Sequence, residues 1–315
     1  MTCVESVAVL GAGAMGAVYA SKFFDVDSSC VYLVASGERY DRLRRDGLVV
    51  NGAHYAIPVR APDEASAPAD LIIVALKHHH LLGAVHDLRN SVGEQTAILS
   101  VMNGLDSEAI IGSVYGMDKM LYCIAIAIDA QRSGNVIGYS TVGTLHFGEA
   151  DNTHLSERVL RIQTLFDRAG IAYTTPQDMI RSIWWKFMIN VGINQASAVL
   201  RAPYGVFQTS PDAQMIMESA MWEVIAIAEA ARVNLVEKDI ADWYTFLNTL
   251  HPEGRTSMLQ DIEAGRRTEV DAFGAKVVEL GRIYGVPTPV NETLLHAIRY
   301  LSADAAHRPP ATVLD

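Results

Sequence analysis

Near the N-terminus, three glycines in the segment Gly11-Ala12-Gly13-Ala14-Met15-Gly16 separate two different hydrophobic patterns. Residues 6–10 form a short β-branched run typical of a buried strand, and residues 14–24 have helical periodicity. At such a junction the first glycine makes a tight turn, the second admits a pyrophosphate, and the third lets helix and strand pack closely. The helix N-terminus then offers free N–H groups to phosphates. The pattern predicts a dinucleotide-binding turn, and a purely structural glycine loop is the alternative.

The first half of the chain alternates apolar strands with helices. The continuous apolar runs at 71–76 and 96–101 are typical of strands buried on both faces. Further strands are predicted at 31–34 and 120–128, and the intervening helices at 38–45, 80–90 and 107–115. This alternation predicts an α/β fold with a Rossmann-type, doubly wound parallel sheet. The pattern then changes to antiparallel strands within 134–148, a helix at 155–169 and a last strand at 171–175.

From about residue 178 onward the pattern contains no further buried strand. The remaining segments all have helical periodicity, and they are 180–200, 210–232, 237–250, 257–264, 269–284 and 290–303. We therefore expect a Rossmann domain over 1–177 and an all-α C-terminal domain over 178–315. Residues 305–315 contain two prolines and are expected to form a loose tail.

Composition narrows the range of partners. The net charge of −11 over 315 residues argues against nucleic acid or an anionic membrane, so an anionic cofactor would need locally concentrated positive charge. No basic leader and no run of roughly 18 apolar residues is present, so we expect neither a signal peptide nor a membrane span. The three cysteines lack metal-ligand spacing and fit a reducing cytoplasm without a bound metal. The long apolar helix at 213–231 is compatible with a homodimer.

The end of the second strand bears on the choice between NAD and NADP. An Asp or Glu at this point would hold the 2′-hydroxyl of NAD. Here residues 31–34 are followed by Ala35 and Ser36, so no acid occupies the strand end itself. Ser36 can donate to a 2′-phosphate and Arg39 can pair with it, whereas Glu38 favours NAD. We favour NADP(H) as the cofactor and leave NAD(H) open.

Two further polar residues follow buried strands. Lys77 closes the run LIIVAL, and Asn103, in an Asn103-Gly104 pair, follows TAILSV. Ligands of doubly wound sheets bind at the carboxyl ends of the strands, so both residues are candidate cofactor contacts. The alternatives are a solvated lysine at a helix start and an ordinary Asn-Gly turn. The histidines at 78–80 cannot converge on a metal because successive helical residues point about 100° apart, and we interpret them as a solvated or capping turn.

The most unusual stretch of the second half is WWKFMINVGIN at 184–194. Its polar residues Lys186, Asn190 and Asn194 are spaced i, i+4 and i+8, which predicts one helix face. Polar groups on an apolar face are costly unless they are paired. A desolvated lysine there would have a lowered pKa and could act as an acid or base near neutral pH. The alternative is a polar seam satisfied by a neighbouring helix.

A second polar group begins at residue 255. Thr256 or Ser257 is the expected N-cap of the helix at 257–264. Glu269 heads the next predicted helix, where a carboxylate in the first turn is favoured by the helix dipole and is by itself ordinary. On spacing alone, neither position indicates a site.

Taken together, these motifs resemble the ketopantoate reductase (2-dehydropantoate 2-reductase) family over nearly the whole chain. The shared segments are GAGAMG, VALK, MNGL, WWKFMINVGINQASAVL and SMLQDIEAGRRTEVD, of which the last two are the specific ones. The resemblance implies NADPH-dependent reduction of ketopantoate to D-pantoate, a step towards pantothenate and coenzyme A. It also implies a helical C-terminal domain like that of 6-phosphogluconate dehydrogenase.

The resemblance implies a role for each candidate residue. Lys186 would be the catalytic acid that protonates the developing alkoxide, and Glu269 would orient groups nearby and touch the nicotinamide ribose. Lys77 would lie near the phosphate and ribose end of the cofactor. The residues implied to contact the substrate, a small 2-oxo acid held in the cleft between the domains, are Asn103 (which also contacts the cofactor), Lys186, Asn190, Asn194 and Ser257.

Two positions depart from the family pattern. Many members have arginine where Ser36 stands, which weakens the NADP assignment, and Tyr204 stands where the resemblance suggests a substrate-side asparagine. A related reductase of another 2-oxo acid therefore stays open. A non-enzymatic NADP-binding sensor is a third reading, against which the presence of Lys186 and Glu269 argues, because a sensor needs no proton donor.

Overall fold

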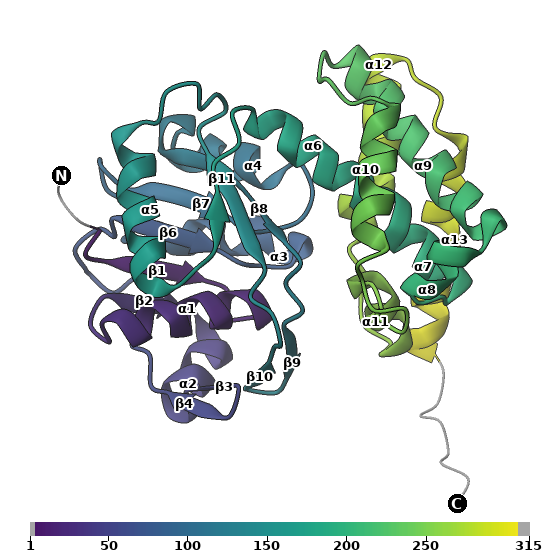
Figure 1. The fold of residues 1–315 in the computed structure, drawn as a ribbon. Helices are drawn as coiled ribbons and strands as arrows, with labels where there is room; N and C mark the ends of the chain where they lie inside the picture. The colour runs from purple at the N-terminus through teal and green to yellow at the C-terminus, as the bar shows by residue number, and fades with distance from the viewer. Residues whose placement is uncertain (1–3, 308–315) are drawn as a thin grey trace, which may run out of the picture. The chain divides into compact units, whose positions relative to one another are not determined.

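The computed structural model describes residues 4–307 (Figure 1). The chain divides into two compact units after Ile183. Helix α6, Met179–Ile189, begins in the first unit and ends in the second. The division therefore lies inside a helix rather than at the predicted position between residues 177 and 178.

An eight-stranded sheet forms the centre of the N-terminal unit, in the order β12-β11-β8-β7-β6-β1-β2-β5. Only β8 and β11 are antiparallel neighbours, and the other pairs are parallel. This arrangement confirms the predicted doubly wound α/β fold. The strands are β1 (Val7–Leu10), β2 (Val31–Val34), β5 (Val59–Arg60), β6 (Leu71–Val74), β7 (Ala97–Ser100), β8 (Met120–Ile126), β11 (Thr144–Gly148) and β12 (Tyr173–Thr174).

Helices cover both faces of this sheet (Figure 1). Successive strand residues point to opposite faces, so Val9 packs in the cluster with Phe23 of α1 and Phe166 of α5, whereas Leu10 packs in the opposite one with α3 and α4. Burial on both faces explains why the central strands are continuous apolar runs. The helices are α1 (Ala14–Val26), α2 (Gly37–Asp46), α3 (His78–Ala84), α4 (Ser107–Tyr115) and α5 (Glu157–Ala169), with 3-10 turns η1 (Val85–Leu88) and η2 (Met117–Lys119).

A second, four-stranded sheet has the order β4-β3-β10-β9, and of its strands β10 alone falls in a segment that is predicted to form strands. Its strands are β3 (Leu48–Val50), β4 (Ala53–Tyr55), β9 (Gln131–Ser133) and β10 (Val136–Gly138). The strands β10 and β11 lie within the predicted segment 134–148 and each has an antiparallel neighbour, but they do not pair with each other: β10 pairs with β9, and β11 pairs with β8 in the other sheet. The strands β3 and β4 have three residues each, which is too short for a recognisable period.

In the C-terminal unit, every element of the described part is helical, as predicted. The elements after α6 are η3 (Asn190–Asn194), α7 (Gln195–Leu200), α8 (Tyr204–Thr209), α9 (Pro211–Ala230), α10 (Glu237–Leu247), α11 (Ser257–Glu263), η4 (Val270–Ala272), α12 (Gly274–Tyr284) and α13 (Pro289–His307). Across residues 4–307, none of the helices is both long and apolar enough to cross a membrane.

Several details of this unit differ from the prediction. The helix expected over 180–200 contains a π-helical segment, η3, and α8 is additional. The helix expected over 269–284 is two elements, η4 and α12, because the backbone of Phe273 is not helical. Residues 305–307, expected in a loose tail, belong to α13, and the rest of that tail lies outside the described residues.

Candidate active site

The glycine-rich turn follows β1 and precedes α1, as predicted. Gly11 has a φ of +101°, and an added Cβ would lie 2.5 Å from the Ala75 carbonyl oxygen. A Cβ on Gly16 would collide with the Gly11 carbonyl. Both positions therefore require glycine for the fold itself, one for the turn and one for close packing of helix on strand.

Gly13 is different because the protein does not crowd it. An added Cβ would meet nothing closer than the Ala75 oxygen at 3.8 Å, and the φ of −76° is open to other residues. Gly13 is also the N-cap of α1, whose first turn has neither a capping side chain nor an acidic residue. The N–H groups of Ala14, Met15 and their neighbours thus lack a side-chain cap next to an uncrowded glycine, which fits the pyrophosphate of a dinucleotide.

At the end of β2 the structure adds a residue that the sequence does not indicate. The Ser36 hydroxyl donates to the Asp87 carboxylate at 3.2 Å, and Asp87 comes from η1, far along the chain. A carboxylate therefore lies beside the strand end where an acid selects NAD. Arg39, in the first turn of α2, is exposed. Because the Ser36 hydroxyl already donates to a carboxylate, Ser36 favours the 2′-phosphate of NADP less than its sequence position suggests.

The other two strand-end candidates lie at the same edge of the sheet. Strands β1, β2, β6 and β7 run parallel, so the segments after them emerge together, with Lys77 after β6 and Asn103 after β7. Lys77 is the exposed N-cap of α3, and Asn103 is half-buried before Gly104, which has a φ of +102°. The three histidines form the first turn of α3, where His78 Nε2 lies 3.7 Å from the Asp106 carboxylate.

Lys186 lies in the last turn of α6. Burial lowers the pKa of Lys186 to about 8 from its ordinary value of 10.5, and no neighbouring charge contributes to the shift. This agrees with the sequence argument that an apolar surrounding brings a lysine into the range of acid–base chemistry near neutral pH.

The helix that carries Lys186 widens into the π turn η3 immediately after α6. Such turns interrupt α-helices frequently at functional sites. Gly192 lies within the π turn, where a Cβ would lie 2.5 Å from the Met221 side chain of α9. Glycine thus permits α9 to approach the widened turn closely. Nothing in the sequence spacing indicates a π turn, because the same residues also fit a continuous α-helix.

Three of the predicted substrate-side residues form one hydrogen-bonded group. The Asn194 amide donates to Asn190 Oδ1 at 3.2 Å, and the Ser257 hydroxyl donates to Asn194 Oδ1 at 3.3 Å. Asn190 and Asn194 are buried. Of the two predicted candidates for the N-cap of α11, Thr256 and Ser257, the N-cap is Thr256, whose hydroxyl accepts from the Leu259 N–H at 3.2 Å. Capping by Thr256 leaves the Ser257 hydroxyl to the asparagine pair.

Glu269 is buried and directly precedes η4. The predicted position at the head of a long helix is wrong, because η4 is a single 3-10 turn separated from α12 by Phe273. The dipole argument for this carboxylate therefore does not apply, since that effect needs a helix of several turns. The catalytic and ribose-binding roles of Glu269 stay predictions.

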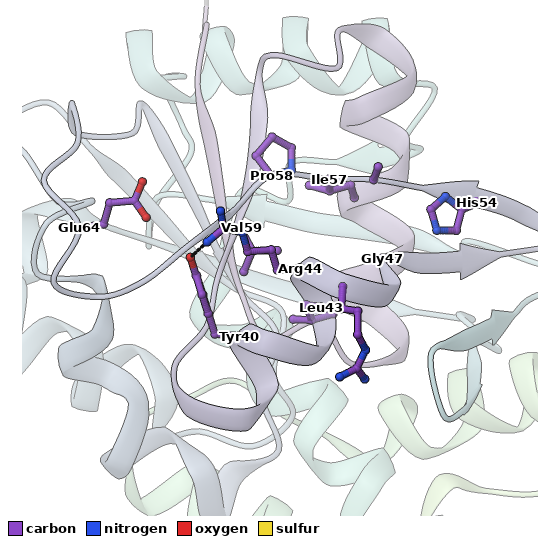
Figure 2. A pocket seen from close by; sticks show the side chains of 11 residues that line it. Tyr40, Leu43, Arg44, Gly47, His54, Ile57, Pro58, Val59 and Glu64 are labelled. Carbon is purple, nitrogen blue, oxygen red and sulfur yellow. Dashed lines mark hydrogen bonds between the residues drawn. The ribbon is translucent and has the colours of Figure 1, made fainter.

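A separate hollow of about 540 Å³ lies at α2 and the segments that follow it (Figure 2). Tyr40, Arg44, His54 and Glu64 are among its lining residues, and Arg44 donates to the Tyr40 hydroxyl at 2.8 Å. None of the residues predicted for cofactor or substrate lines it. The hollow is therefore distinct from both groups of candidate residues.

The fold, the glycine turn and the lysine-containing helix define a class of protein, the NAD(P)-dependent oxidoreductases with a Rossmann domain and a helical domain. Residues 7–152 match the model of the family "Ketopantoate reductase PanE/ApbA", and residues 178–302 match the model of its C-terminal part. The chain belongs to the ketopantoate reductase family.

A curated relative carries the family's name, and solved structures at lower identity share the fold. The 2-dehydropantoate 2-reductase of Halobacterium salinarum is 26% identical over 303 residues, which cover 95% of this chain and 99% of that protein. The structure of D-mandelate dehydrogenase with NADH and anilino(oxo)acetate has a TM-score of 0.86 at 20% identity, covering 96% and 99% of the two chains. A dimeric ketopantoate reductase from Staphylococcus aureus has a TM-score of 0.79 at 20% identity, covering 95% and 99%.

Proposed function

We propose that this protein reduces a 2-oxo acid with a nicotinamide dinucleotide, and that ketopantoate, reduced to D-pantoate with NADPH, is its substrate. The observation that carries the proposal is Lys186, which is half-buried and has a pKa lowered to about 8, on the helix that also carries Asn190 and Asn194. Family membership and the curated relatives named 2-dehydropantoate 2-reductase support ketopantoate as the first candidate.

The N-terminal unit holds the cofactor in this proposal. The N–H groups at the start of α1 bind the pyrophosphate, and the open space at Gly13 admits it. Lys77 binds near the phosphate and ribose end, and Asn103 contributes an amide at the neighbouring strand end. When bound, the reduced nicotinamide supplies a hydride to the carbonyl carbon of the substrate.

Lys186 provides the acid in this scheme. As charge develops on the carbonyl oxygen, the Lys186 ammonium stabilises it and then transfers a proton from Nζ, leaving a neutral amine. A pKa of about 8 leaves most of the lysine protonated at neutral pH and still makes it a far better acid than an exposed lysine. Proton and hydride together convert the ketone to the alcohol.

Side chains of the C-terminal unit position the substrate in this proposal. Asn190, Asn194 and Ser257 are already bonded to one another, so the amide and hydroxyl groups are held in fixed orientations. Such preorganised donors bind the carboxylate and hydroxyl oxygens of a small 2-oxo acid without first being ordered. Glu269 is proposed to orient the reacting groups and to contact the nicotinamide ribose.

The wider setting follows from the proposed reaction. Reduction of ketopantoate belongs to pantothenate and coenzyme A biosynthesis, which fits a cytoplasmic enzyme. A homodimer is supported by the Staphylococcus aureus relative and by α9, where Met215 and Trp222, seven residues apart and thus on one face, are 66% and 42% exposed. Large apolar side chains on one face are typical of a surface covered by another subunit.

A second substrate class is favoured by Tyr204. Its backbone N–H donates to the Gly254 carbonyl at 2.9 Å, close to the segment that leads to Ser257, and burial raises the pKa of its hydroxyl. An aromatic side chain in place of the family's asparagine favours a 2-oxo acid with an apolar or aromatic substituent. The D-mandelate dehydrogenase neighbour, with bound anilino(oxo)acetate, supports the same alternative.

One panel of assays separates these candidates. The loss of absorbance at 340 nm is measured with NADPH and with NADH, using ketopantoate, phenylglyoxylate and pyruvate as substrates. The highest kcat/KM with ketopantoate and NADPH is the result we expect. A preference for phenylglyoxylate would establish the second substrate class, and binding of both cofactors without turnover of any 2-oxo acid would contradict the proposed function.

A further inference from the structure

The hairpin β9–β10 brings an arginine to the glycine-rich turn. Arg132 of β9 donates from Nη1 to the Ala12 carbonyl at 2.6 Å and from Nε to the Gly134 carbonyl at 2.6 Å. Ala12 lies between Gly11 and Gly13, so the guanidinium is fixed within one residue of the open position at the N-terminus of α1. Sequence periodicity cannot reveal this contact, because it joins residues that are 120 positions apart.

Arg132 is not neutralised where it lies. Both of its hydrogen-bond acceptors are neutral backbone carbonyls, and burial together with the positive charges of Arg42 and Arg39 lowers the pKa of Arg132. Arg39 and Arg42 lie on α2, three residues apart and thus on one face, and both are exposed. Within residues 4–307, no ion pair joins any of these three arginines to a carboxylate. Arg132 is therefore repelled by the other two guanidinium groups, and positive charge gathered in this way without a direct ion pair favours a bound anion.

The lack of an ion pair is not shared by every arginine of α2. Arg45, also on α2, forms two hydrogen bonds with the Asp46 carboxylate at 2.7 and 2.8 Å, and Arg44 bonds to Tyr40. The protein carries a net charge of −11, so positive charge beside the glycine turn is concentrated against the overall balance. This meets the condition that an acidic protein needs in order to bind an anionic cofactor.

We propose that Arg132, together with Arg39 and Arg42, binds phosphate oxygens of the dinucleotide cofactor. The proposal rests on the use of a nicotinamide dinucleotide argued above, and it adds Arg132 and Arg42 to the residues that hold it. Arginine suits this task because its planar fork of donors matches phosphate oxygens. The phosphate belongs either to the pyrophosphate, beside Ala12, or to a 2′-phosphate on the adenosine ribose, beside α2.

Binding measurements without substrate test the proposal. Dissociation constants for NADPH and NADH are measured by tryptophan fluorescence for the wild type, Arg132→Gln and the double variant Arg39→Ala/Arg42→Ala. We expect each variant to bind at least one cofactor about tenfold more weakly or worse, as is usual for a lost charge-assisted hydrogen bond. Arg45→Ala is the matched control, because it removes one positive charge from α2 outside the cluster, and its affinities should stay within about twofold of the wild type.

Two smaller probes identify the phosphate. ADP carries a pyrophosphate without a 2′-phosphate, and adenosine 2′-monophosphate carries only the latter. Weaker binding of ADP by the variants assigns the arginines to the pyrophosphate, and weaker binding of adenosine 2′-monophosphate assigns them to the 2′-phosphate. Unchanged affinity for both probes and both cofactors in the double variant would overturn the proposal.

Substitution of Arg132 could weaken cofactor binding merely by disturbing the glycine turn. The double variant controls for this effect, because the exposed Arg39 and Arg42 side chains do not hold that turn. Arg132→Lys keeps the positive charge but loses the planar guanidinium that donates to two carbonyls. It should therefore bind phosphate better than Arg132→Gln. Equal losses in these two variants, with the double variant unaffected, would show that Arg132 only supports the loop and would overturn the proposal. Failure of the proposed reductase function is a different result from failure of the arginine proposal. It would appear as wild-type protein that binds the cofactor but reduces no 2-oxo acid.

Discussion

The two groups of candidate residues are specified in different ways. In the N-terminal unit the glycine turn acts through its backbone, because Gly11 and Gly16 are forced by local geometry and α1 offers N–H groups. In the C-terminal unit the candidate residues act through their side chains, with Lys186 desolvated and the Asn190–Asn194–Ser257 group held by mutual hydrogen bonds. Substitutions in the first group should therefore change folding and cofactor affinity, whereas those in the second should change the rate and the KM for the 2-oxo acid.

The largest effect should come from Lys186→Ala. Loss of a positioned acid typically lowers the rate about 10²- to 10⁴-fold, and cofactor affinity should be unchanged because the glycine turn is untouched. Steady-state kinetics and cofactor titration measure the two quantities. Lys238→Ala is the control, because that exposed lysine only pairs with Asp242 on the surface of α10. A drop in cofactor affinity equal to the drop in kcat would break the proposed division of roles.

The glycine turn offers a matched pair of substitutions. Gly16→Ala forces a Cβ against the Gly11 carbonyl and should destabilise the fold by several kcal/mol, whereas Gly13→Ala meets nothing within 3.8 Å. Gly13→Ala should keep the melting temperature within a few degrees and weaken cofactor binding, because its methyl group occupies the space left for the pyrophosphate. Equal stability of the two variants would contradict this assignment of the glycines.

The difference between backbone-determined and side-chain-determined groups also explains which features can be predicted from the sequence. Gly11 and Gly16 are recognisable because no other residue fits, and the strands are recognisable because burial on both faces makes them continuously apolar. The spacing of Lys186, Asn190 and Asn194 suggests a polar face and an acid–base role for the lysine, but only the resemblance gives the asparagines a substrate to bind. The π turn leaves no pattern, since it changes backbone hydrogen bonding and not residue type.

Contacts between distant segments are the part that sequence cannot supply. The hydrogen bond from Ser36 to Asp87 joins residues 51 positions apart. The hydrogen bond from Arg132 to the Ala12 carbonyl joins residues 120 positions apart. Neither residue belongs to a local motif, and the short strands that position Arg132 show no period. The break at Phe273, which separates Glu269 from α12, is likewise invisible in a segment that has helical periodicity throughout.

The pH dependence should follow Lys186. Since only the protonated lysine donates, kcat/KM should fall about tenfold per pH unit above a pKa of about 8. Between about pH 8 and 10.5 the unfolded chain holds a proton that the folded protein has released, so this lysine makes the free energy of unfolding rise with pH in that window. Lys186→Met should remove both effects, as pH–rate profiles and denaturant titrations would show. An activity independent of pH up to 10 would contradict the role of Lys186 as acid.

The neighbouring residues Thr256 and Ser257 at the start of α11 should have smaller and opposite effects on stability and on the KM for the 2-oxo acid. Ser257→Ala should raise the KM for the 2-oxo acid about tenfold, because it removes a hydroxyl from the group with Asn194, and should leave stability nearly unchanged. Thr256→Ala should do the reverse and cost about 1 kcal/mol of stability through the lost cap. A loss of stability in Ser257→Ala together with a raised KM in Thr256→Ala would contradict the roles given to these two residues.

The smallest effect should be on cofactor choice. Asp87→Asn removes a negative charge beside Ser36, so the affinity for NADPH should rise a few-fold relative to that for NADH. The ratio of the two dissociation constants measures this change. A ratio that does not move would place the adenosine ribose away from the Ser36–Asp87 pair.

The most direct test of the account is transfer of label from the cofactor. NADPH carrying deuterium at both C4 positions is incubated with ketopantoate and with wild-type protein or Lys186→Ala, and the product is analysed by mass spectrometry. The account predicts pantoate with one deuterium at C2, formed rapidly by the wild type and at least about 10²-fold more slowly by the variant. Unlabelled pantoate, or equal rates for the two proteins, would contradict hydride transfer assisted by Lys186.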